Sequence, residues 1–527
     1  MTGGDGTASG GLRGAIARAS GADVMTRARR TRTLLAVILA AATLLLAPSA
    51  TAATATPTVL RAEAVPDPLV TGPVSGGSGR PVTSSPVPLG PSGYVEQEWF
   101  LSGTATGYTQ AGNWGSDGRW AVQPAEQAAY RTRILVRRPA DPARFNGTVV
   151  VEWLDLPGAQ DGVDLDPDFL YEHAELLRAG YAWVGVSAQE QGVSSLRSLD
   201  PDRYGTLNHP GDTFSYSIFS QATQALRHPR GGDPLGGLRP SAFIADGYSG
   251  SSARMVTYTN AIQPIDHLFN GVLIHSRWAR SAPISQTPQA QQPAPPIVET
   301  RTDLRAPVLT VETESEILQT YSLHPMLNYY PATQADSRGF RLWEVPGTSH
   351  VDAGLDALLA KETGSPVTPC ALPANDGQEE AVMDAALARL NRWVRTGTAA
   401  PRAPRIRVGA DASAIARDGY GNALGGVRTP SLQAPTSTLT GAGNTGASPQ
   451  CEIEGTTTPF TGAQLRALYP THTAYVAAVT RAADRDVAAG FLLPLDAAEL
   501  IWTADRTGAA PTVLPPGSGI VCAVCRD

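Results

Sequence analysis

Lysine is almost missing from this chain, since Lys361 is the only one, and no long basic run follows residue 32. The 41 Lys and Arg residues against 48 Asp and Glu residues give a net charge of −7. Proteins that bind nucleic acids neutralise phosphates with clustered basic side chains. The charge balance therefore excludes a nucleic-acid partner held in this way.

Aromatic residues form only 6% of the chain and charged residues 17%, whereas Gly (53) and Pro (43) are frequent. Hydrophobic residues still make up 42% of the 527 residues, which is enough for a large buried core. A disordered or fibrous chain is thereby excluded. The length allows two to four domains at about 100–200 residues each.

Long apolar runs are missing after the first 52 residues, and the one before that point has the form of an export signal. Four arginines lie between residues 27 and 32, an apolar stretch covers 34–47, and a small-residue cleavage site ends at Ala52. The stretch is shorter than the roughly 20 residues of a membrane span. We expect a secreted chain cleaved after Ala52, which meets the membrane only during export; an uncleaved N-terminal anchor is the alternative.

Cysteine is scarce, and its four positions bear on the export hypothesis. In an oxidising compartment four cysteines predict two disulfides, with three possible pairings. We favour one long-range bridge and one local bridge. A zinc site at the C-terminal pair would need a second pair of ligands that the sequence does not offer, so we expect neither metal nor cofactor. The expected bridges are Cys370–Cys451 and Cys522–Cys525.

Four segments follow from the changes in composition. The upstream region with the export signal covers 1–52, and a Pro-, Ser- and Gly-rich lead-in, expected to be irregular, covers 53–93. A core with regular elements covers 94–401, and an extension with shorter elements and a helix near 473–489 covers 402–527.

Strands and helices alternate through the core. This order predicts a mainly parallel sheet with helices on both faces, and the extension packed on it. Half-buried strands are expected at 96–101 and 130–136, buried strands at 148–154, 181–187, 242–245, 271–275, 307–311 and 340–345, and helices at 169–179, 214–227, 252–260 and 379–394.

One of these strand-to-helix turns carries a candidate nucleophile. The strand 242–245 runs into Gly247-Tyr248-Ser249-Gly250-Ser251 and then into a helix. This arrangement has the form of a nucleophile elbow, G-x-S-x-G, with Ser251 in place of the last glycine. The elbow needs small residues two before and two after the nucleophile, and around Ser249 these are Gly247 and Ser251. Ser251 as nucleophile, or a plain turn capped by Ser252, are the alternatives.

A serine hydroxyl needs a base to take its proton, and His350 lies just after the strand 340–345. His275, at the end of another strand, is the next candidate for the base. The acid that orients the base is expected after the strand 307–311, where Glu316 is favoured and Glu314 is a close rival. The resulting order Ser…Glu…His is that of α/β-hydrolases and differs from the order in chymotrypsin and subtilisin.

An oxyanion hole needs two backbone N–H groups. Gly250, directly after the nucleophile, is expected to supply one of them. The loop after the strand 148–154 is expected to supply the other, from Leu156 or Asp155, because Pro157 has no N–H.

Several of these segments together resemble a known family. The segments 145–154, 182–189, 247–251 and 344–350 are similar to those of exported bacterial "alpha/beta hydrolase domain-containing" proteins. The resemblance continues through Cys451 and 455–460 to the helix near Tyr475, over about residues 94–500, and so implies that 402–527 belongs to the same unit. It departs at the serine motif, where the family resembles G-x-S-Q-S-G and this chain has Gly250 and Ser252.

The resemblance implies the α/β-hydrolase fold and a serine hydrolase, with esters as the expected substrates. We therefore expect an acyl-enzyme mechanism acting on a small-molecule or polymer ester. An acyltransferase or amidase with the same three side chains is one alternative, and a non-catalytic binding protein of this fold is another. The sequence indicates no oligomeric state.

Overall fold

The computed structural model describes residues 64–156, 162–318, 324, 327–367 and 369–507. The chain divides into two units, 1–60 and 61–527, and all the described residues belong to the second. The predicted export signal and the predicted Cys522–Cys525 bridge lie outside the described residues.

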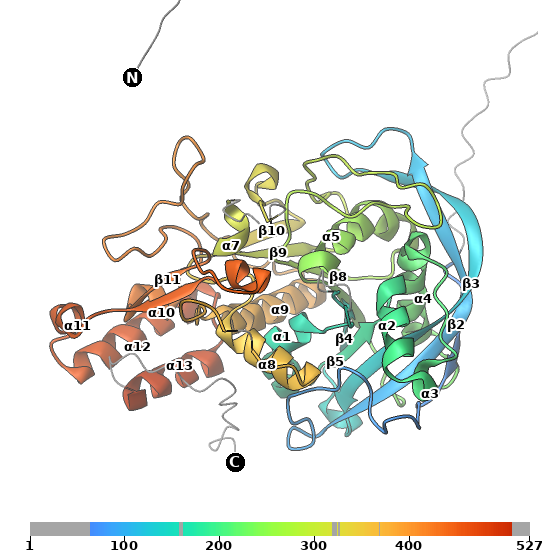
Figure 1. Ribbon diagram of the computed structural model, residues 1–527, viewed down its shortest axis with the longest axis horizontal. Helices are drawn as coiled ribbons and strands as arrows, with labels where there is room; N and C mark the ends of the chain where they lie inside the picture. The colour runs from blue at the N-terminus through green and yellow to red at the C-terminus, as the bar shows by residue number, and fades with distance from the viewer. Residues whose placement is uncertain (1–63, 157–161, 319–323, 325–326, 368, 508–527) are drawn as a thin grey trace, which may run out of the picture. The chain divides into compact units, whose positions relative to one another are not determined.

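A ten-stranded sheet forms the centre of this unit, in the order β10-β9-β8-β7-β4-β5-β3-β2-β1-β6 (Figure 1). Every neighbouring pair from β10 to β5 is parallel. The mainly parallel sheet expected from the sequence is therefore present. These parallel strands are β4 (Thr148–Trp153), β5 (Ala182–Val186), β7 (Ala242–Asp246), β8 (Gly271–His275), β9 (Val308–Thr313) and β10 (Phe340–Val345).

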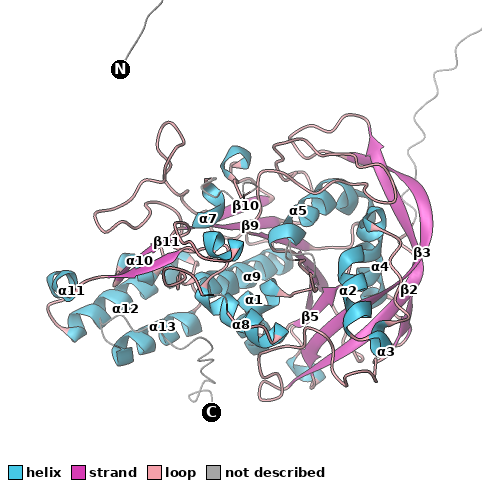
Figure 2. Ribbon diagram, viewed as in Figure 1, coloured by secondary structure: helices cyan, strands magenta, loops and turns pink. Residues whose placement is uncertain are grey.

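Helices cover both faces of the sheet (Figure 2). In β4, Val149 and Val151 belong to one hydrophobic cluster with Phe219, whereas Val150 belongs to another with Leu387. Successive side chains of a strand point to opposite faces, so a strand covered on both faces is mainly apolar. The first cluster includes α4 (Ser215–Arg227) and α5 (Ser249–Thr257), and the second includes α1 (Pro167–Arg178) and α9 (Glu379–Thr396).

An antiparallel hairpin of long strands extends the sheet at one side (Figure 1). Its strands, β2 (Tyr94–Ala111) and β3 (Ala121–Pro139), are much longer than the expected 96–101 and 130–136. The lead-in expected to be irregular contributes β1 (Leu69–Thr71), which pairs with β2 and with β6 (Arg230–Gly231). Three residues are too few to show the period of a strand, which is why the sequence did not predict β1.

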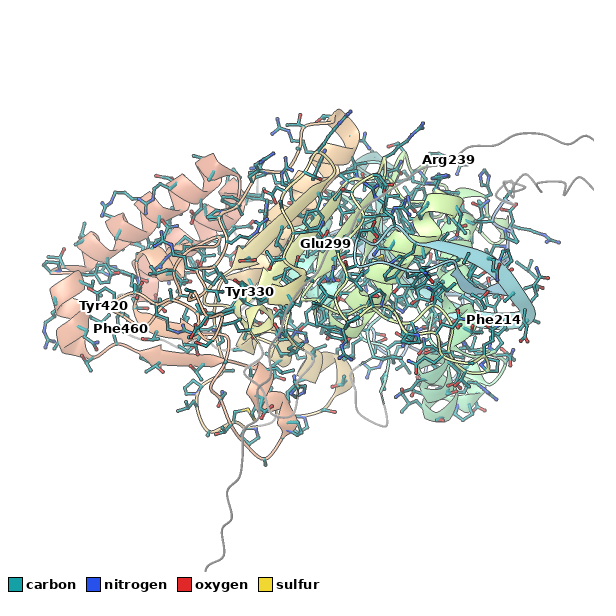
Figure 3. All side chains as sticks on the ribbon, turned by 90° about the horizontal axis from the view of Figure 1, so that it is seen from above. Phe214, Arg239, Glu299, Tyr330, Tyr420 and Phe460 are labelled. Carbon is teal, nitrogen blue, oxygen red and sulfur yellow. A yellow bond between two sulfur atoms is a disulfide. The ribbon has the colours of Figure 1, made fainter. Side chains whose placement is uncertain are left out.

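The C-terminal extension contains a second, two-stranded sheet and three longer helices. The expected helix near 473–489 is α12. Tyr420 and Phe460 lie side by side in the extension, with ring centroids 5.5 Å apart (Figure 3). The elements of the extension are α10 (Pro430–Gln433), β11 (Ser437–Thr440), β12 (Thr456–Pro459), α11 (Gly462–Leu468), α12 (His472–Ala489) and α13 (Pro494–Thr507).

The extension is also joined to the core covalently. A disulfide connects Cys370 to Cys451, as expected from the sequence, with their Cα atoms 5.6 Å apart. No helix among the described residues is long and apolar enough to cross a membrane. The remaining helices of the core are α2 (Glu190–Leu199), α3 (Pro201–Tyr204), α6 (Gln263–Asp266), α7 (Glu314–Ile317) and α8 (Ala353–Thr363).

Candidate active site

Ser249 is the first residue of α5, at the sharp turn that follows β7, and its backbone has the conformation that a nucleophile elbow needs. Its φ angle is 53°, a left-handed value that a residue with a side chain adopts at a cost of about 1–3 kcal/mol. A Cβ atom built on Gly247 would lie 3.1 Å from the carbonyl oxygen of Ser251, so the turn leaves little space for a side chain at this position. The requirement for a small residue before the nucleophile is therefore met in the structure.

Ser251, the rival nucleophile, has its hydroxyl engaged by the turn. Its Oγ donates to the carbonyl oxygen of Tyr248 at 2.7 Å and accepts from the Tyr248 N–H at 3.0 Å. The side chain is buried, with 1% of its surface exposed. Its hydroxyl therefore stabilises the elbow, which explains how the turn tolerates a serine where the motif has glycine.

The side chains of Ser249, His350 and Glu316 form one hydrogen-bonded chain. Ser249 Oγ lies 2.9 Å from His350 Nε2, and His350 Nδ1 lies 2.7 Å from Glu316 Oε1. The carboxylate can only accept, so Nδ1 donates to it and Nε2 is left to accept from the serine hydroxyl. The structure thus brings together the three residues that the sequence singled out from three separate strand ends.

Glu316 is held by a capping box at the start of α7. Its Oε2 accepts from the backbone N–H of Thr313 at 2.9 Å and also from the Thr313 hydroxyl. Burial raises the pKa of Glu316, but the hydrogen bond and charge of His350 outweigh it and hold the pKa below its ordinary value. The Thr-x-x-Glu spacing is a recognised capping signal, so Thr313 could have been found in the sequence.

The other two glutamates of this segment, Glu314 and Glu312, lie in different surroundings. Glu314 accepts from the Gly347 N–H at 2.8 Å and from Arg417 Nη2 at 2.6 Å. Glu312 is the last but one residue of β9, fully buried, and burial followed by the charge of Glu316 raises its pKa well above the ordinary value. Neither carboxylate is recorded within hydrogen-bond distance of His350, so the geometry favours Glu316 as the acid.

The loop that carries His350 is fixed by the extension and by the elbow. The His350 N–H donates to Ser315 Oγ at 2.9 Å, and this hydroxyl donates to the carbonyl oxygen of Gly441 at 2.6 Å. Tyr248 stacks on the imidazole, with centroids 5.0 Å apart, and its hydroxyl donates to the His350 carbonyl oxygen. Ser315 and Gly441 could not be predicted from the sequence, because their contact joins residues more than 100 positions apart.

His275, the second candidate for the base, also packs against Tyr248. Its ring packs edge-on against the Tyr248 ring, with centroids 5.0 Å apart. Both of its nitrogens are engaged: Nδ1 lies 2.8 Å from Asp168 Oδ1, and Nε2 lies 2.8 Å from Glu379 Oε1. His275 therefore has no free nitrogen for a serine hydroxyl.

A cavity of about 280 Å³ adjoins the residue after the nucleophile. Both predicted oxyanion donors, Gly250 and Leu156, line it. The N–H of Asp155, the alternative donor, is occupied, because it donates to the carbonyl oxygen of Leu165 at 2.9 Å. The cavity is lined by Asp155, Leu156, Gln189, Gly250, Ala253, Arg254, Trp278, Arg280, Ser281 and Ala282.

One comparison with known proteins matches most of the chain. A family model described as "Alpha/beta hydrolase domain" matches residues 70–502. Similar solved structures include an α/β serine hydrolase without a lid from Xanthomonas campestris, at 12% identity and a TM-score of 0.27, over 50% of this chain and 97% of that one. They also include the glucuronoyl esterase from Solibacter usitatus, at 10% identity and a TM-score of 0.24, over 48% of this chain and 76% of that one. No curated protein matches the sequence.

Proposed function

Because the chain belongs to the alpha/beta hydrolase domain family, we propose that it is a serine hydrolase that cleaves carboxylic esters through an acyl-enzyme. Ser249 is the nucleophile, His350 the base and Glu316 the acid that orients the base. The observation that carries the proposal is the unbroken hydrogen-bonded chain from Ser249 Oγ through the imidazole to Glu316.

The proposed reaction follows the protons along this chain. His350 Nε2 takes the hydroxyl proton as Ser249 Oγ attacks the ester carbonyl carbon, and the carbonyl oxygen becomes an oxyanion. His350 then returns the proton to the departing alcohol, and the acyl group stays on Ser249. A water molecule, activated by the same imidazole, releases the acid. The negative charge of Glu316 stabilises the imidazolium that forms in each half.

Labelling with a fluorophosphonate tests the nucleophile, and hydrolysis of esters with graded acyl chains tests the reaction. We expect covalent labelling at Ser249 in the wild type and its loss in Ser249→Ala, with an unchanged circular dichroism spectrum. Product analysis with added alcohols separates a hydrolase, which yields the free acid, from an acyltransferase, which yields the new ester. A wild-type protein that neither labels nor turns over any ester would contradict the proposal.

We also propose that the protein is exported and cleaved after Ala52. The succession of arginines, apolar residues and small residues before that position supports this. The Cys370–Cys451 disulfide is in keeping with an oxidising compartment. N-terminal sequencing of protein from the culture medium should return Ala53, and material that begins at Thr2 or Thr26 would contradict cleavage.

A further inference from the structure

Asp155 places a carboxyl group beside the predicted oxyanion hole. Its Oδ1 accepts from the Ser251 N–H at 2.9 Å, and the backbone of Leu156 also hydrogen-bonds to the carboxyl group. A Cβ atom built on Gly250 would lie 3.0 Å from the same Oδ1. The carboxyl group therefore lies among the backbone groups that the sequence marked as oxyanion donors, at the N-terminus of α5.

This position is unusual for an ionised group in a hydrolase site. The reaction creates a negative charge on the substrate oxygen next to Gly250 and Leu156, and nearby like charges repel most strongly where water is excluded. Asp155 has only 6% of its surface exposed and lines the cavity. An ionised Asp155 would occupy the N–H groups and oppose the oxyanion at the same time.

The surroundings of Asp155 contain both signs of charge. Burial is the largest influence and raises its pKa to about 6, although the hydrogen bonds from Ser251 and Leu156 and the charges of His350 and Arg254 act in the opposite direction. Arg254 is itself paired with Asp212 at 2.7 Å. The titratable and charged groups that face Asp155 are His350 after β10, Arg254 on α5, Tyr248 in the elbow, Asp168 on α1 and Arg280 on the cavity wall.

We propose that Asp155 is a further catalytic residue, whose neutral carboxyl group donates a hydrogen bond to the oxyanion at Gly250 and whose ionised form weakens that site. The inference rests on the proposed serine hydrolase mechanism. Asp155 transfers no proton in this step: its O–H bond stays intact, and the Ser249 proton still passes to His350. A carboxylic acid kept neutral by an apolar site donates to an oxyanion in the same way in ketosteroid isomerase.

The ionisation of Asp155 should affect the pH profile of turnover. As pH rises through about 6, Asp155 loses its proton and wild-type turnover should fall. Asp155→Asn keeps the shape of the side chain, donates through its amide and cannot ionise, so this limb of the profile should be missing. Because one oxyanion donor is worth about 10²–10³ in rate, the variant should exceed the wild type by at least about tenfold at pH 8.

The experiment measures kcat/KM for one ester and the rate of fluorophosphonate labelling from pH 5 to 9, in the wild type, Asp155→Asn and Asp155→Ser. Asp212→Asn is the matched control, because it removes a carboxylate bound to the same helix at Arg254 without touching the elbow, and its profile should keep the wild-type shape. Asp155→Ser is also neutral and should lose the same limb, so the test stands even where Asp155→Asn fails to fold.

Two failures can be told apart. If the wild type labels at Ser249 but its pH profile matches that of the folded Asp155 variants, or exceeds theirs at pH 8, the role of Asp155 is wrong and the proposed function stands. If the wild type does not label at any pH, the proposed function is wrong, and the role of Asp155 with it.

Discussion

Glu314 and Glu316 stand two residues apart and serve different loops. Glu316 Oε1 lies 2.7 Å from His350 Nδ1, whereas Glu314 accepts from the Gly347 N–H and from Arg417. The two side chains separate because β9 ends at Thr313 and α7 begins at Glu314. In a continuing strand, residues two positions apart would point to the same face, but both glutamates lie in the helix. The same turn gives Glu316 its capping bond with Thr313.

Exchange of each glutamate for glutamine should separate the two roles. Glu316→Gln removes the charge that orients and stabilises His350, and ester turnover should fall by about two to four orders of magnitude. Glu314→Gln should leave turnover within about threefold and instead lower thermal stability, because it weakens the ion pair with Arg417. Kinetics and thermal melting of both variants measure this; the reverse pattern would make Glu314 the acid.

The two serines of the elbow offer a second matched pair. Ser249→Ala should abolish turnover, because no other hydroxyl is recorded within hydrogen-bond distance of His350 Nε2 among the described residues. Ser251→Ala should keep measurable turnover and cost about 1–3 kcal/mol of stability, since it leaves the Tyr248 N–H in the elbow without its partner. Loss of activity in Ser251→Ala but not in Ser249→Ala would instead identify Ser251 as the nucleophile.

The parallel part of the fold could be predicted from the sequence because its strands are covered on both faces. Runs such as 149–151 in β4 are apolar at every position, and the lengths of these strands and their spacing from the helices leave few other interpretations. The hairpin β2–β3 was predicted only in part. Many residues of its outer half are exposed, so neither a continuous apolar run nor a clear alternation marks where the strands end.

The three side chains of the candidate site could be predicted because each follows a strand end, and the ends of parallel strands meet at one edge of the sheet. The groups that hold them could not. Gly441 and Arg417 reach the acid loop from the extension, and nothing local in the sequence marks such a contact. The position of the Asp155 carboxyl group could not be predicted either, because the sequence marks this residue only as a donor of its backbone N–H, and that N–H donates to Leu165.

Removal of the Cys370–Cys451 bridge should affect both stability and the position of His350. The bridge closes a loop of 81 residues, and native bridges of this kind contribute about 2–5 kcal/mol. Ile453, two residues after Cys451, accepts from the Val351 N–H at 3.2 Å, beside His350. We expect Cys370→Ser/Cys451→Ser to melt at a lower temperature and to lose turnover.

The other two cysteines supply the control for this prediction. Cys522→Ser/Cys525→Ser lacks the C-terminal pair and should behave as the wild type, both with and without reductant. Reductant should lower the melting temperature of the wild type to that of the Cys370→Ser/Cys451→Ser variant. Peptide mapping without reductant that finds Cys370 or Cys451 as a free thiol would contradict the bridge.

His275 joins two helices beneath the elbow through buried acids. Its nitrogens face Asp168 on α1 and Glu379 on α9, each at 2.8 Å, and all three side chains are fully buried. Burial raises the pKa of both Asp168 and Glu379 to about 8. Asp168 also hydrogen-bonds to the carboxyl group of Asp246, which immediately precedes the elbow, so the two carboxyls share a proton.

The pH dependence of stability should report this cluster. Folded Asp168 and Glu379 hold protons that the unfolded chain has lost above about pH 4, so their contribution to stability should fall as pH rises from about 4 to about 8. His275→Gln removes the hydrogen-bond partner that Asp168 and Glu379 share and should cost about 1–3 kcal/mol. The cost should be larger at pH 8 than at pH 5, where both acids are neutral, and denaturant unfolding at the two pH values measures it. His228→Gln, at an exposed histidine, should show no such difference.

Because His275 cannot reach Ser249, the folded His275→Gln variant should still label with a fluorophosphonate. Loss of labelling at unchanged stability would instead make His275 the base and contradict the assignment of His350.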